Sequence, residues 1–400
     1  MRKICADLII PVSSAPLRNG VVAIDKDGTI LSIEEGNDLK DVSIEKFSGI
    51  ICPGFINAHC HLELSYMKGK IPEHTGIVQF LINLIEYRNQ RNQNASGGIL
   101  AEEINTAIRK AVAEMKTQGI AGVGDISNDN YSFHVKSSGD LLFHTFIESF
   151  GFDPLQAESY FQKALQLFQE ARASGLSASI TPHAPYSVTP ELFRQIFSFK
   201  AYHPALFSYH NQESDAEAAL FKSAQGDFMK LFHQFNLPGK TFLPTGKNSL
   251  HSVIDYFPPE SRMLFVHNTT TDAADIELII SKLPESYFCF CPNANLYIEN
   301  TLPSFPLFKS YPDRTCVGTD SYASNHQLSI LQELITIQQY FPSIATAELI
   351  RWATLNGANF YYWNKRLGSL ETGKKPGINL ISPVGPAFEL LKDSSVTKLA

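Results

Sequence analysis

The stretch from Gly49 to His61 reads Gly-Ile-Ile-Cys-Pro-Gly-Phe-Ile-Asn-Ala-His-Cys-His. A mostly apolar run that is closed by polar residues predicts a buried strand ending at the histidines. His59 and His61 lie two positions apart, and side chains on a strand alternate between its faces, so both rings point the same way. The two histidines can therefore hold one metal ion between them.

Seven more apolar runs follow the first, and helical patterns lie between or after most of them. The eight runs lie near residues 50–57, 120–126, 141–148, 177–182, 205–209, 263–266, 287–291 and 315–318. Parallel strands need crossover connections, usually helices, so this alternation predicts a (β/α)8 barrel of the TIM type. One of its helices is expected over Ala216–Phe235, and residues 68–98 are expected to form a loop-and-helix insertion.

Polar residues stand at the ends of several of these runs. They are His183, His210 with Glu213, His267 and Asp320. The working residues of a βα barrel lie at the C-terminal ends of its strands, so we expect these side chains and the first two histidines to meet at one mouth.

Both ends of the chain are rich in strand patterns and turn residues. The segment Thr372-Gly373-Lys374-Lys375-Pro376-Gly377 precedes the apolar Ile378-Asn379-Leu380-Ile381, and short strand-like runs separated by turns fill the first 48 residues. We therefore predict an α/β protein of two parts. Residues 50–365 form the barrel, and residues 1–49 with 366–400 form one small β-sandwich domain.

The composition narrows the possible functions. The 400 residues include 33 basic and 40 acidic side chains, for a net charge of −7. No basic cluster with interleaved aromatics is present, so a nucleic-acid partner is not expected. No run reaches the length of a membrane span, and the N-terminus lacks a long apolar signal core. Six cysteines without a CxxC pair favour reduced thiols and a cytoplasmic protein.

A metal site is the simplest chemical interpretation of the predicted mouth. Several imidazoles and one carboxylate fit Zn²⁺ or Fe²⁺ and leave a position for water. A histidine taken alone is more often a surface or hydrogen-bonded core residue, and we expect that of most other histidines here.

Glu213 lies three residues after His210, just past a predicted strand. A carboxylate there can move a proton between an activated water and a leaving group. The alternative is a solvated acid near a helix N-terminus, where the helix dipole favours Asp215 and Glu217 as well.

Several motifs together carry a family resemblance. They are Pro53-Gly54-Phe55-Ile56-Asn57-Ala58-His59-Cys60-His61, His183-Ala184-Pro185-Tyr186-Ser187, His210-Asn211-Gln212-Glu213-Ser214, Cys291-Pro292-Asn293-Ala294-Asn295, Gly318-Thr319-Asp320-Ser321 and Gly368-Ser369-Leu370-Glu371-Thr372-Gly373-Lys374. With them the chain resembles, over essentially its whole length, the amidohydrolase superfamily in its single-metal deaminase and chlorohydrolase branch.

The resemblance implies a role for each residue of the mouth. His59, His61, His210 and Asp320 would ligate one divalent metal, zinc or alternatively iron. His267 would hold and polarise the attacking water, Asp320 would also accept its proton, and Glu213 would protonate a substrate ring nitrogen. His183 would contact the substrate. It stands where binuclear relatives carry a carboxylated lysine, which argues for a single metal.

Finer motifs are similar to the aminofutalosine deaminases and, less closely, to the adenosylhomocysteine/methylthioadenosine deaminases. They are His59–Ser65, Gly226–Phe228 and Gly318–Asn325. The chain departs from the family pattern at Asn211-Gln212, where Leu/Val-Ala is usual, and at Lys374–Asn379. Glu63 is expected to bind a ribose hydroxyl or an ordered water, or else to be a structural acid.

The sequence therefore predicts a metal-dependent hydrolase that acts on a small molecule. The leading expectation is a deaminase of an aminated purine nucleoside-type ring, such as aminofutalosine or an adenosine derivative. The alternatives are another ring hydrolase (a guanine or cytosine deaminase, or a triazine-type chlorohydrolase) and a non-catalytic binding protein on this fold. A homo-oligomer is compatible with all of them.

Overall fold

Two four-stranded parallel sheets form the centre of the computed structural model, which describes residues 1–36, 43–94, 97–199, 206–237 and 242–400. The first sheet holds β6 (Phe55–Cys60), β7 (Ile120–Ser127), β8 (Leu142–Ser149) and β9 (Ser177–Pro182), and the second holds β10 (Leu206–Asn211), β11 (Arg262–His267), β12 (Tyr287–Phe290) and β13 (Thr315–Val317). Residue 205, the first of one predicted strand, lies outside the described residues. Almost every strand residue is buried, as expected for parallel strands covered on both faces.

The two sheets are hydrogen-bonded to each other at both edges. Between β9 and β10, the backbone N–H of His210 donates to the carbonyl of His183 at 2.9 Å. Between β13 and β6, the N–H of Thr319 donates to the carbonyl of His59 at 3.1 Å. Both junctions thus lie beside predicted site residues.

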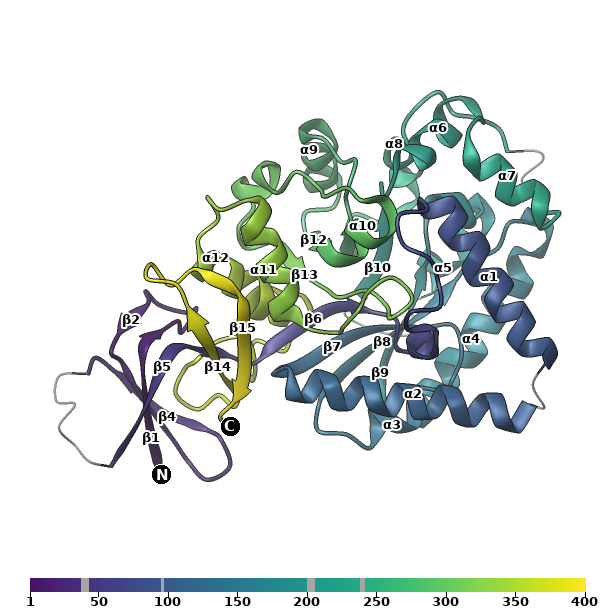
Figure 1. The fold of residues 1–400 in the computed structure, drawn as a ribbon. Coiled ribbons are helices and arrows are strands. Elements are labelled where there is room, and N and C mark those ends of the chain that lie inside the picture. The colour runs from purple at the N-terminus through teal and green to yellow at the C-terminus, as the bar shows by residue number, and fades with distance from the viewer. Residues whose placement is uncertain (37–42, 95–96, 200–205, 238–241) are drawn as a thin grey trace.

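Helices lie between or after most of these strands, as Figure 1 shows. They are α1 (Ile77–Asn94), α2 (Gly97–Thr117), α3 (Phe133–Ser137), α4 (Ala157–Ala173), α5 (Pro190–Ser198), α6 (Asp215–Ser223), α7 (Asp227–Gln234), α8 (Ser249–Val253), α9 (Ala273–Lys282), α10 (Pro292–Glu299), α11 (Ile330–Tyr340), α12 (Thr346–Arg351) and α13 (Gly357–Phe360), with the 3-10 turns η1 (Leu62–Met67) and η3 (Pro185–Ser187). Local sequence explains several starts. The Thr189 side chain accepts the N–H of Leu192, and Pro190 follows it at the first turn of α5.

Two predicted boundaries are wrong. The helix expected over Ala216–Phe235 is two helices, α6 and α7, because Ala224 (φ 51°) and Gly226 (φ 92°) turn the chain into the left-handed region between them. The single strand expected from Gly49 to His61 is also two strands. A side chain at Gly54 would place its Cβ 2.5 Å from the carbonyl oxygen of Pro376, so only glycine allows the crossing there.

The two chain ends share one seven-stranded sheet, seen as adjacent purple and yellow strands in Figure 1. Its order is β15 (Leu390–Lys398), β14 (Ile378–Val384), β5 (Ile44–Pro53), β1 (Arg2–Ile9), β3 (Val21–Ile24) and β4 (Ile30–Glu34), with β2 (Leu17–Arg18) paired to β1. Only β1 and β5 run parallel. A separate buried cluster, which includes Ile4, Val22, Ile51 and Ile378, packs this region. Within the described part of the chain, no helix combines the length and apolarity that a membrane crossing requires.

Candidate metal and catalytic site

The first two predicted ligands end strand β6. His59 is fully buried, and His61 is 8% exposed. The next residue, Leu62, donates its backbone N–H to Oδ1 of Asp125 at 2.8 Å. The other oxygen of Asp125 lies 2.6 Å from Nζ of Lys136, in an ion pair with both side chains fully buried. Breaking such a pair costs about 3–5 kcal/mol, so it fixes the chain direction directly after His61.

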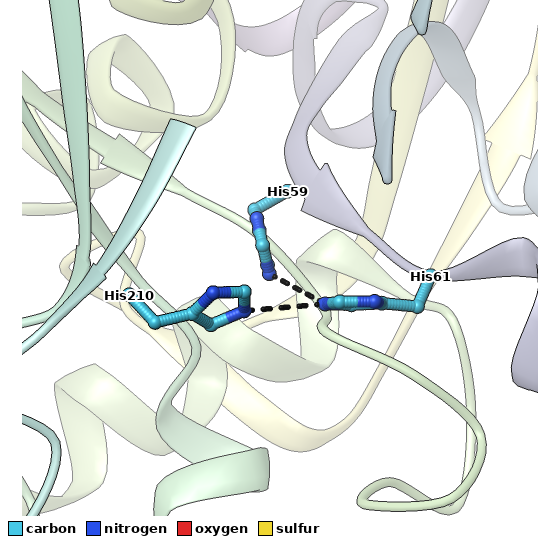
Figure 2. Close-up of side chains that lie close together, drawn as sticks. All are labelled: His59, His61 and His210. Carbon is cyan, nitrogen blue, oxygen red and sulfur yellow. Dashed lines mark hydrogen bonds between the residues drawn. The ribbon is translucent and has the colours of Figure 1, made fainter. Parts of the chain in front are cut away.

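Three imidazole rings meet at one point, as Figure 2 shows. Nε2 of His61 lies 3.1 Å from Nε2 of His59 and 3.3 Å from Nε2 of His210. Nδ1 of His210 donates to the carbonyl oxygen of His183 at 3.0 Å. This bond leaves the Nε2 lone pair of His210 free to face the other two rings.

The electrostatics of the three rings favour a bound cation. Burial, followed by the neighbouring imidazoles, lowers the pKa of His59 and His61 well below its usual value, and burial also lowers the pKa of His210. The rings are therefore uncharged at neutral pH, and a single proton on Nε2 of His61 can serve only one of its two contacts with the other rings. A metal ion fits such a donor set, because neutral imidazole nitrogen is its usual ligand.

Asp320 completes this group from the end of β13. Its Oδ1 lies 3.4 Å from Nε2 of His61 and 3.7 Å from Nε2 of His59. Its Oδ2 accepts a hydrogen bond of 2.5 Å from the hydroxyl of Ser324, which sets the orientation of the carboxylate. The backbone approaches closely here, since a Cβ on Gly318 would lie under 3 Å from backbone atoms of His59.

Glu213 and His267 form a second pair beside the predicted metal ligands. Oε1 of Glu213 lies 3.6 Å from Nε2 of His267, and both side chains are buried. The solvated alternative for Glu213 is therefore excluded. Burial, reinforced by the charge of Asp320, raises the pKa of Glu213 well above its usual range, while burial lowers the pKa of His267 to about 3. These directions favour the protonated form of Glu213 and the neutral form of His267.

His183 and Glu63 lie at the edge of the same space. Nδ1 of His183 shares a hydrogen bond of 2.6 Å with the hydroxyl of Ser187, and burial lowers the pKa of this histidine to about 4. Glu63 accepts the backbone N–H of Asn128 at 2.5 Å and its side-chain amide at 2.8 Å. Burial, followed by the charge of Asp129, raises the pKa of Glu63 to about 8.

One cavity of about 190 Å³ brings most of these side chains together. Its polar end is lined by His61, Glu63, His183, His210, Glu213, His267 and Asp320. Helix α1 supplies an apolar wall with Phe80, Leu81, Leu84 and Ile85. A few polar groups in a pocket with an apolar wall are typical of sites that orient a small-molecule ligand.

A second group of possible ligands overlaps the first. Glu148, His183 and His210 also offer atoms close to one another, and Oε1 of Glu148 lies 3.6 Å from Nδ1 of His210. That nitrogen already donates to the carbonyl of His183, so His210 can serve a metal only through Nε2. The geometry therefore concentrates ligands on the first group.

Comparison with known proteins places the chain in a family. The model of the amidohydrolase family matches residues 50–399.

The chain belongs to the amidohydrolase family.

Relatives of this amidohydrolase include nucleoside deaminases. An adenosine deaminase of Helicobacter pylori is 25% identical over 339 residues, which cover 83% of this chain and 79% of the relative. The solved H. pylori aminofutalosine deaminase in complex with methylthio-coformycin has a TM-score of 0.77 and 21% identity, covering 96% and 93% of the two chains. An adenosine deaminase of Xanthomonas campestris, solved with bound zinc, has a TM-score of 0.69 and 20% sequence identity. The match covers 95% of this chain and 84% of that chain. These structures share the fold of this amidohydrolase.

Sequence reasoning missed three elements of the site. Helix α1 was expected as part of an insertion, but not as a wall of the cavity. The second is the buried ion pair of Asp125 and Lys136. The sequence signal that could have indicated it is an acidic residue inside the apolar run of β7. Ser324 stood in a quoted motif, but its bond to Asp320 depends on a turn that the sequence does not specify.

Proposed function

We propose that this amidohydrolase is a metal-dependent deaminase that releases ammonia from an aminated purine nucleoside-type ring, as in adenosine or aminofutalosine. The observation that supports this proposal most is the position of Glu213 and His267 beside four converging side chains that could bind a metal. The deaminases among its relatives support the choice of an adenosine-type ring.

The proposed ligands of one divalent metal are His59, His61, His210 and Asp320. The metal when bound would supply the acidity that activates a water molecule at neutral pH. Zinc is favoured, because imidazole and carboxylate donors suit it and a structural neighbour contains it; iron is the alternative.

Proton transfers are assigned to the side chains that face the cavity. Nε2 of His267 orients the attacking water, and Oδ1 of Asp320 takes a proton from it. Protonated Glu213 donates to the ring nitrogen next to the carbon under attack, which makes that carbon electrophilic. The water oxygen bonds to that carbon, and the amino group takes the proton held by Asp320 and leaves as ammonia. The proton of the new hydroxyl returns to Glu213 as the carbonyl forms.

The remaining residues of the cavity would hold the substrate. His183 contacts the ring, and the α1 wall excludes water from its face. Glu63 is placed to accept a ribose hydroxyl or an ordered water, although both of its oxygens also accept bonds from Asn128.

We further propose the architecture that the sequence predicts. The eight central strands would form a closed (β/α)8 barrel, supported by the hydrogen bonds at both sheet edges. The sequence predicts this barrel over residues 50–365, but residues 50–53 belong to β5 and pair with β14, so the barrel would begin at β6. The β-sandwich domain predicted for residues 1–49 and 366–400 would extend to Pro53, supported by the shared sheet and separate core. A cytoplasmic location is supported by six free, buried cysteines, while a homo-oligomer and the absence of a nucleic-acid partner stay predictions.

A screen for ammonia release tests the function. Zinc-loaded protein is incubated with adenosine, methylthioadenosine, aminofutalosine, guanine, cytosine and a chlorotriazine. We expect ammonia from one or more of the adenosine-type nucleosides, and none after the metal is removed with a chelator. Chloride release without ammonia would favour the triazine-type hydrolase. No reaction with any compound, in protein that retains its metal, would favour a binding protein.

A further inference from the structure

Two buried amides stand where the chain departs from its family pattern, between His210 and Glu213. Asn211 is fully buried and Gln212 is 3% exposed, yet neither lines the cavity. Gln212 also has left-handed backbone, with φ 45°. A non-glycine residue keeps such a conformation only where its surroundings hold it there.

The backbone of Gln212 is held on both sides. Its N–H donates to Oε1 of Glu217 at 3.1 Å. Its carbonyl accepts the backbone N–H and the hydroxyl of Thr270, at 2.9 and 3.1 Å. These contacts fix the peptide that leads directly into Glu213.

The side chain of Gln212 is held as well. Its Oε1 accepts the hydroxyl of Thr271 at 2.8 Å, and its Nε2 donates to Oδ2 of Asp275 at 2.7 Å. Asn211 runs alongside and donates from Nδ2 to Oδ1 of Asn268 at 3.1 Å. All of these partners lie within eight residues after His267.

The network therefore joins two loops that carry the two proton-handling groups. One loop leads from Gln212 to Glu213, and the other leads from His267 through Asn268 to Asp275. We propose that Gln212 is a positioning residue that sets the distance between Glu213 and His267 through its bonds to Thr271 and Asp275. This inference rests on the proposed function of Glu213.

A donor-reversal experiment separates positioning from general stability. Gln212→Glu replaces the Nε2 donor with an oxygen that faces the carboxylate of Asp275. The hydrogen bond between the two side chains is therefore lost. Asp275→Asn in the same chain restores a donor toward residue 212, and Asp275→Asn alone measures the cost of losing the acceptor that Oδ2 offers to the N–H of Asp272. Misplacement of a reacting group by 1 Å costs about 100-fold in rate, so we expect kcat for ammonia release to fall about 10- to 100-fold in the single variant. The double variant should recover to within about threefold of the Asp275→Asn variant.

A buried glutamine far from the site provides the matched control. Gln338 on α11 donates from Nε2 to the Thr346 hydroxyl at 3.1 Å and accepts the Leu390 N–H at 2.6 Å. Gln338→Glu loses an equivalent donor and should leave kcat within about twofold, whatever its effect on Tm. Metal content should stay at the level of the unaltered enzyme in all variants, and KM should change much less than kcat.

Two results would overturn the inference. One is an unchanged kcat in folded Gln212→Glu, and the other is a loss that the double variant does not recover. If Gln212→Glu does not fold, Thr271→Val removes one donor to Gln212 with almost no change in side-chain shape. An unchanged kcat in Thr271→Val would also overturn the inference. Unaltered enzyme that releases no ammonia from any nucleoside would overturn the proposed function, and this inference with it.

Discussion

The two central sheets deliver their functional side chains in different ways. The first sheet, β6 to β9, presents His59 and His61 without left-handed backbone, with φ −123° at His61. The second sheet, β10 to β13, ends in left-handed residues at three strand ends: Gln212 (φ 45°), His267 (φ 72°) and Asp320 (φ 55°). Backbone of this kind costs of order 1–3 kcal/mol per residue and gathers at functional sites.

The difference follows the chemistry assigned to each sheet. Ligands need only converge on a point, and a strand end held by the buried pair of Asp125 and Lys136 achieves that. Proton carriers must face a particular atom at a particular distance, and the strained turns with their buried hydrogen bonds orient Glu213 and Asp320. In the proposed function the first sheet therefore supplies two metal ligands, and the second supplies the other two, His210 and Asp320, together with Glu213 and His267.

Loss of a proposed metal ligand should have the largest effect, and the effect should be the same for a ligand from either sheet. His59→Ala and Asp320→Ala should each abolish metal retention and ammonia release, because each removes one of four donors. Elemental analysis and a turnover assay on the same preparation check this. Retained metal in Asp320→Ala would confine the metal site to the first sheet and His210.

Glu213→Gln should separate orientation from binding. The amide keeps the shape of the side chain but cannot deliver the proton, so kcat should fall by about two to four orders of magnitude with the metal retained. Steady-state kinetics and metal analysis measure both quantities. Near-normal turnover would contradict the deaminase mechanism while leaving the fold and the ligand group intact.

His183→Ala should affect substrate binding more than chemistry. This side chain belongs to the first sheet, and we expect a higher KM or a changed ring preference, with the metal retained and a smaller change in kcat. The measurement is a comparison of KM and kcat across the nucleoside panel. A loss confined to kcat would move His183 into the orienting group.

A buried histidine of the first sheet should make stability depend on pH. His144 on β8 bonds the hydroxyls of Ser177 and Ser179 at 2.9 Å each, and burial lowers its pKa to about 3. The unfolded chain takes up this proton below about pH 6.5 and the folded chain does not, so stability is lost as the pH falls toward 3. His144→Gln should reduce the slope of the unfolding free energy by about 1.4 kcal/mol per pH unit near pH 5. Equal slopes in denaturant unfolding at pH 4.5 to 6 would show that His144 is protonated when folded.

Cys60→Ser should have the smallest effect. Cys60 lies between the two ligands of β6 but is buried in the hydrophobic core, away from the cavity. Metal content and kcat should stay within about twofold, with some loss of Tm from the buried hydroxyl. A loss of metal would show that the thiol takes part in the site.

The strand-end residues were predictable because parallel strands share one direction and one edge. That rule brought His59, His210, His267 and Asp320 together from the apolar runs alone. Local features were predicted less well. Gly54 splits the first strand and Ala224 breaks a helix, and both depend on contacts or dihedral angles that a pattern of apolar residues does not encode.

The orienting contacts lie furthest beyond sequence reasoning. Asn211-Gln212 stood out as a departure from the family pattern, but its partners come from a loop more than 50 residues away. The bond from Ser324 to Asp320 likewise needs the actual course of a turn. Pattern reasoning finds which residues meet, whereas the distances between them follow from the packing of the whole fold.

A zinc titration tests whether the four proposed ligands form one metal site on which activity depends. Metal-free protein is mixed with increasing Zn²⁺, and ammonia release from the best nucleoside is measured at each ratio. We expect activity that rises linearly and stops rising at one zinc per chain, because His59, His61, His210 and Asp320 would form a single site. Activity that continues to rise to two zinc ions per chain, or that needs no metal, would contradict it.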